Sequence, residues 1–142
     1  MVPDDISRVL SDFGLANDVY EDRSGLVGNI RKLFGAKESM DLDRVALAVE
    51  DGKGVILGVN AAMLNGRYGE ITANHAISVV GTARDLTSHE VVGFYINDTG
   101  HPDAAKDGRL ERSQTKFVPL WRMRQAYEVP NAAAIVTRGR IR

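Results

Sequence analysis

Residues 74–98 read NHAISVVGTARDLTSHEVVGFYIND, and this stretch decides the fold. Its outer segments, 75–83 and 91–97, are rich in β-branched and aromatic residues, as strands are. The polar segment between them, 84–90, has the length and character of a hairpin link. The sequence therefore predicts two antiparallel strands joined by a short connection.

The apolar pattern changes along the chain from helical spacing before residue 52 to strand-like runs after it. The further predicted elements are helices over about 3–13 and 24–34, a helix from the N-cap Asp41 to Gly52, strands at 54–60, 116–118 and 132–137, and a late helix at 119–127. We therefore expect an α+β fold in one domain spanning 1–142. Its helical part covers about 1–52, and a mostly antiparallel sheet with one late helix covers about 53–142.

The chain of 142 residues contains no cysteine. This excludes a disulfide scaffold, a zinc ribbon, an iron–sulfur centre and a thiol nucleophile within the chain itself. No apolar run approaches the roughly 20 residues of a membrane span, and the N-terminus lacks the pattern of a secretory signal. No metal-ligand or phosphate-loop spacing is present, so we expect neither a metal nor a cofactor.

Two side chains suited to catalysis stand at the ends of the predicted strands. His75 opens the first strand and Asp98 follows the second. Antiparallel pairing puts the start of one strand beside the end of the next, so we expect these side chains to meet. An imidazole oriented by a carboxylate is the base–orienter pair of a nucleophilic triad. Asn97 competes with Asp98 for this role, and only one of the two can face His75 because strand neighbours point to opposite faces.

Four segments carry a resemblance to a known family: EDGKG (50–54), VILGVNA (55–61), NHAISVVG (74–81) and GFYINDTG (93–100). Together they resemble the second half of the papain-like cysteine peptidase fold, in particular the bacteriocin-processing peptidases and their relatives in bacterial toxins and effectors. The resemblance implies a papain-like fold, with His75 as catalytic base and Asp98, or its neighbour Asn97, as the residue that orients it. It also implies a nucleophilic cysteine on a helix that precedes the first helix of this sequence.

The resemblance and the missing cysteine lead to one expected function and one alternative. We expect the His/Asp-bearing portion of a papain-like cysteine hydrolase, forming the effector domain of a larger bacterial protein that is secreted or delivered. Its partners would be a protein or peptide substrate and an immunity protein. The alternative is a cysteine-less papain-like toxin or binding module, cytoplasmic if it is not delivered, that acts on RNA or tRNA, as a ribonuclease, or on a protein partner.

Charge is distributed unevenly along the sequence. Residues 1–108 hold 10 basic and 17 acidic side chains, a net charge of −7, whereas residues 109–142 hold 8 and 2, a net charge of +6. A basic end is typical of proteins that bind an anionic partner, although the two halves can also complement each other within one fold. The candidate anion-binding residues are Lys116, Arg138, Arg140 and Arg142.

Overall fold

The computed structural model describes residues 3–21, 37–67, 69, 71–98 and 115–142. These residues form four helices and a seven-stranded sheet. The elements in chain order are α1 (Pro3–Asp12), β1 (Asn17–Glu21), β2 (Lys37–Glu38), α3 (Leu42–Glu50), β3 (Lys53–Val59), α4 (Ala61–Leu64), β4 (His75–Arg84), β5 (Val91–Asn97), β6 (Thr115–Pro119), α6 (Leu120–Tyr127) and β7 (Ala133–Arg140). None of the described helices is long and apolar enough to cross a membrane.

The strands lie in the order β2-β1-β7-β3-β4-β5-β6. All neighbouring strands pair antiparallel except β1 and β2, which run parallel. Strand β7 therefore lies inside the sheet between β1 and β3, while β6 forms one edge. The fold class is α+β with a mixed sheet.

The structure confirms the elements predicted from residue 41 onward. The hairpin is present as β4 and β5, and the apolar run forms β3. Asp41 caps α3, because its carboxylate accepts a hydrogen bond of 2.8 Å from the main-chain nitrogen of Arg44. Gly52 ends the same helix with a positive φ of 82°, a conformation that glycine adopts without strain.

The prediction of an entirely helical first part was wrong. Strand β1 and the two-residue β2 lie within residues 1–52, and the helix predicted over 24–34 falls outside the described residues. Strand β1 pairs with β7, for example Asn17 with Thr137. The stretch NDVYE is extended because it pairs with a strand that is distant in the sequence, and its own residue pattern does not predict a strand.

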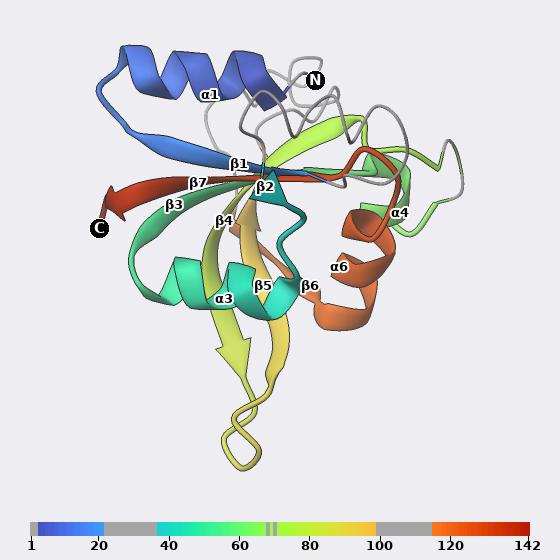
Figure 1. The fold of residues 1–142 in the computed structure, drawn as a ribbon. Helices are drawn as coiled ribbons and strands as arrows, with labels where there is room; N and C mark the ends of the chain where they lie inside the picture. Colours follow the sequence, from blue (N-terminus) through green and yellow to red (C-terminus); the bar gives the residue numbers. More distant parts are fainter. Residues whose placement is uncertain (1–2, 22–36, 68, 70, 99–114) are drawn as a thin grey trace, which may run out of the picture.

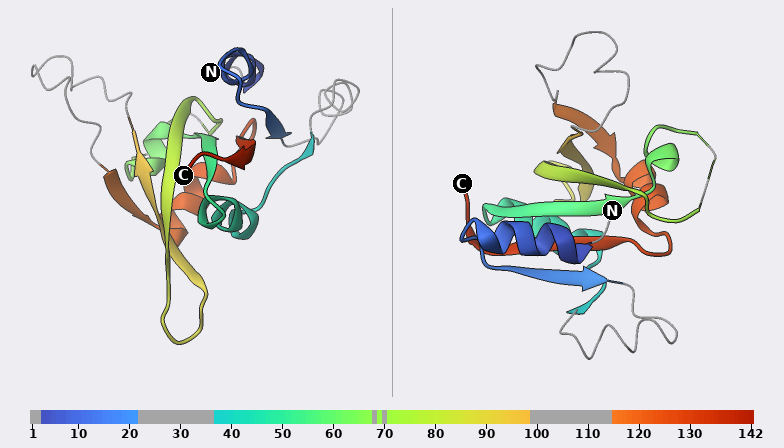
Figure 2. Two further views of the ribbon diagram at one scale, coloured as in Figure 1. Left: turned by 90° about the vertical axis from the view of Figure 1, so that its left-hand side faces the viewer. Right: turned by 90° about the horizontal axis from the view of Figure 1, so that it is seen from above.

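The sheet has helices on both faces, as Figures 1 and 2 show. Helix α1 lies over β1 and β7 on one face, and α3, α4 and α6 lie on the other. The main apolar core fills the space between the sheet and α3 and α6, and its fully buried members include Leu57, Ile77, Phe94 and Met123. The residues of α1 are all at least partly exposed, so most of the burial occurs on the α3–α6 face.

Candidate active site

His75 and Asp98 lie within hydrogen-bond distance, with 2.7 Å between Nε2 and Oδ1. The sheet register explains this contact. Ser78 of β4 is paired with Asn97 of β5. Because the strands are antiparallel, Asp98, the next residue, lies beside the first residues of β4. By strand alternation, His75 shares a face with the buried Ile77. The two side chains are 21% and 12% exposed, so the pair is partly shielded from water and still reachable from outside.

The contact determines which imidazole nitrogen is available for chemistry. An ionised carboxylate only accepts hydrogen bonds, so Nε2 carries the proton that is donated to Asp98. Nδ1 is then the nitrogen with the lone pair, and no described residue donates a hydrogen bond to it. In this tautomer Nδ1 is the nitrogen of His75 that can accept a proton.

Asn97, the competing orienter, points elsewhere. Its Oδ1 accepts a hydrogen bond of 2.8 Å from the hydroxyl of Thr115 on β6. Strand alternation puts Asn97 and Asp98 on opposite faces of β5, and Asp98 is the one on the side of His75. Of the two residues that the sequence left open, Asp98 is thus the one whose side chain contacts His75.

A buried asparagine that the sequence analysis did not identify fixes the backbone before His75. Asn60 is 0% exposed and follows β3 directly. Its Nδ2 donates a hydrogen bond of 2.8 Å to the main-chain oxygen of Thr72. Its Oδ1 accepts one of 2.9 Å from the main-chain nitrogen of Met63, near the start of α4. The polar residue after the apolar run 54–59 is the signal that could have indicated it, because asparagine is a favoured N-cap.

Asn74 adds a second tie beside His75. Its side-chain Oδ1 accepts a hydrogen bond of 3.0 Å from the main-chain nitrogen of Ala61. Its main-chain nitrogen donates a hydrogen bond of 3.0 Å to the main-chain oxygen of Val59. Val59 is also the residue paired with His75 in the sheet. These bonds join the end of β3, the start of α4 and the start of β4 next to His75 in the chain.

The arginines of the C-terminal end are engaged by this chain's own groups. Each donates to a partner that is far away in the sequence, and the pairs are Arg138 with Asp18 at 3.1 Å, Arg140 with Asp51 at 3.1 Å, and Arg142 with the main-chain oxygen of Val80 at 2.9 Å. The basic end and the acidic body of the chain therefore complement each other here. Lys116, like Arg142, has a neutral partner, because its Nζ donates a hydrogen bond of 3.1 Å to Oδ1 of Asn65.

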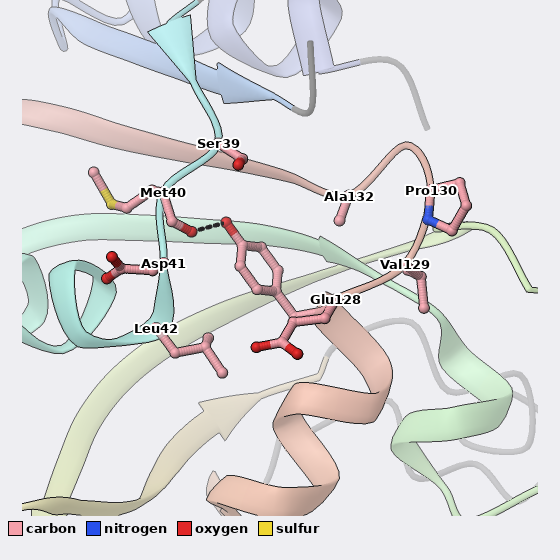
Figure 3. Close-up of a pocket in the computed structure, with 9 residues that line it drawn as sticks. Ser39, Met40, Asp41, Leu42, Glu128, Val129, Pro130 and Ala132 are labelled. Atoms are coloured by element: carbon pink, nitrogen blue, oxygen red, sulfur yellow. Dashed lines mark hydrogen bonds between the residues drawn. The ribbon is translucent and has the colours of Figure 1, made fainter. Parts of the chain in front are cut away.

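A separate pocket lies between the start of α3 and the end of α6 (Figure 3). Its volume is about 440 Å³, and Ser39, Met40, Asp41, Leu42, Tyr127, Glu128, Val129, Pro130 and Ala132 line it. The buried Tyr127 donates a hydrogen bond of 2.5 Å from its hydroxyl to the main-chain oxygen of Met40. This bond ties the segment before α3 to the end of α6, and the pocket shares no residue with the His75–Asp98 pair.

Tyr127→Phe is expected to lower the free energy of unfolding by about 1–2 kcal/mol at neutral pH, because the oxygen of Met40 loses its buried donor. Burial, with the charge of Asp41, raises the pKa of Tyr127 well above its ordinary value. The unfolded chain therefore ionises first, and wild-type stability falls as pH rises above about 10. Urea unfolding should show the difference between variant and wild type shrinking above that pH. A difference that does not change with pH would contradict this role of the phenol.

Within the described residues, no group of three or more metal-binding side chains comes together. No protein-family model, curated protein or solved structure matches this chain.

Proposed function

We propose that this chain carries the base and orienter of a papain-like cysteine hydrolase that acts on a protein or peptide. The observation that carries the proposal is the 2.7 Å contact of His75 Nε2 with Asp98, which leaves Nδ1 as the basic nitrogen. The chain has no cysteine, so a polypeptide segment outside these 142 residues supplies the thiol. The resemblance of residues 50–100 further supports an effector domain of a larger bacterial protein, opposed in its producer by an immunity protein.

The proposed reaction is acyl transfer through sulfur. The thiol gives its proton to Nδ1 of His75, and the thiolate attacks the carbonyl carbon to form a tetrahedral oxyanion. Asp98 stabilises the imidazolium that results and holds the ring in place. The imidazolium then protonates the leaving amine as the carbon–nitrogen bond breaks. Water, deprotonated by the same nitrogen, hydrolyses the thioester and regenerates the thiol.

A small thiol added to the purified chain tests the proposal directly. The substrate is the p-nitrophenyl ester of acetylalanine, and the added thiol is 2-mercaptoethanol. Sulfur forms the new bond to the acyl carbon, the thiol proton goes to His75, and p-nitrophenolate leaves and is measured by its absorbance. We expect the rate with chain and thiol together to exceed the sum of the rates with each alone.

The S-methyl ether of the same thiol is the control reagent, since it has no S–H proton to transfer. It should give no acceleration beyond the rate of the chain alone. Additive rates for chain and thiol would contradict the proposal, because Nδ1 would then not act as a base toward sulfur.

A further inference from the structure

Four strand ends meet at one end of the sheet, and each contributes a polar side chain. They are the exit of β3 into α4, the start of β4, the end of β5 and the start of β6. Lys116 of β6 is opposite Ile96 of β5, and Asp98 lies two residues beyond Ile96. Directly opposed residues share a face, and so do residues two apart. Lys116 therefore lies on the same face as the His75–Asp98 pair.

The ammonium of Lys116 is half-buried and is bound only by a neutral group in the described part of the chain. Its partner is Oδ1 of Asn65, the C-cap residue of α4. Among the described residues, no carboxylate lies within ion-pair distance of Nζ, in contrast to Arg84, which binds Glu50, and Arg138, which binds Asp18. An ammonium has three donors, so two remain for a ligand.

A second cation, Arg122, reaches the turn formed by Asn65 and Gly66. The guanidinium of Arg122 lies against Gly66, where a Cβ atom would be only 2.3 Å from it. It stacks on the ring of Trp121 at 4.7 Å from the centroid, and no described carboxylate lies within ion-pair distance of it. Lys116 and Arg122 thus both approach the Asn65–Gly66 turn, and neither has a negative partner among the described residues.

We propose that Lys116 and Arg122 form a subsite for a carboxylate, so that the site selects peptides with an acidic side chain beside the bond to be cleaved. This inference rests on the proposed function, because it names the substrate of that site. A partly desolvated cation pair binds a carboxylate through charge-assisted hydrogen bonds. An RNA strand needs cations spaced along its backbone, and the C-terminal arginines that could extend the pair are bound to this chain's own groups.

Two capped peptides that differ by one group test the subsite. Acetyl-Ala-Glu-Ala-amide and acetyl-Ala-Gln-Ala-amide are titrated into the 15N-labelled chain at neutral pH, and amide shifts report the affinity. We expect the glutamate peptide to bind about 10-fold more tightly and to shift the amides of Asn65, His75 and Lys116. Equal affinity, or no shift with either peptide, would overturn the subsite.

Matched variants assign the preference to its residue. Lys116→Met keeps the apolar stem and removes the charge, so it should abolish the preference, whereas Lys116→Arg should retain it. Lys53→Met is the control, since Lys53 lies at the opposite end of β3 and pairs with Asp51. A preference that survives in Lys116→Met, or that is lost in Lys53→Met, would contradict the assignment.

The outcomes separate this inference from the proposed function. A glutamate preference that depends on Lys116, found together with additive rates in the thiol assay, would support the subsite and refute the hydrolase. Acceleration by thiol together with equal affinities for the two peptides would support the hydrolase and refute the subsite. A single-stranded RNA that binds at the same amides more tightly than the glutamate peptide would overturn the choice of a peptide.

Discussion

His75→Ala is expected to abolish the acceleration of thiol-dependent ester cleavage. A positioned general base contributes about 10²–10⁴-fold to a rate, and the alanine variant should fall to the sum of the separate rates. Asp98→Asn keeps an oxygen that can accept from Nε2 and loses only the negative charge, so we expect a smaller loss of roughly tenfold, about 1.4 kcal/mol. Asp98→Ala removes the acceptor as well and should approach His75→Ala.

The matched control is the other described histidine. His89 lies exposed in the link between β4 and β5 with a φ of 61°, and asparagine adopts that conformation readily. His89→Asn should therefore leave the acceleration unchanged. Loss of activity in His89→Asn, or full activity in His75→Ala, would show that Nδ1 of His75 is not the base.

Asn60→Asp is expected to destabilise the fold by about 3–5 kcal/mol at neutral pH. The replacement buries a charged carboxylate and turns the donor to the Thr72 oxygen into a repelling acceptor. Burial should raise the carboxyl pKa above its unfolded value of about 3.9, so stability is retained below that pH and lost as pH rises. Chemical unfolding at neutral and at acidic pH measures both effects.

Asn74→Asp provides the contrast because, within the described part of the chain, the Asn74 side chain bonds only through Oδ1, to the nitrogen of Ala61, and aspartate retains that oxygen. Its side chain is exposed, so we expect a change within about 0.5 kcal/mol. Similar costs for the two substitutions would contradict the role given to the Asn60 donor.

The pairing of His75 with Asp98 could be predicted because its causes are local. Period-two alternation and a short polar link specify a hairpin, and a hairpin puts the start of one strand beside the end of the next. The choice of Asp98 over Asn97 needed the structure, because it depends on which face of β5 is turned toward His75.

What the sequence did not reveal depends on contacts between distant residues. The stretch NDVYE becomes β1 because β7 pairs with it, and Arg138 meets Asp18 across a separation of 120 residues. The basic C-terminal end indicated that Arg138, Arg140 and Arg142 could bind an anionic partner, and the partners that they have within this chain could not be read from the sequence. Asn60 had a local signal, but its bond to Thr72 follows from the path of the chain after α4.

The interior position of β7 has a consequence for synthesis on the ribosome. Chains emerge from the N-terminal end first, so β1 and the β3–β6 group are both made before the strand that lies between them. Until residues 133–140 leave the ribosome, β1 and β3 each present an unpaired edge open to other chains. Nascent chains halted before β7 should therefore be sensitive to protease and prone to aggregate, and release of this last strand should convert them to a protected form.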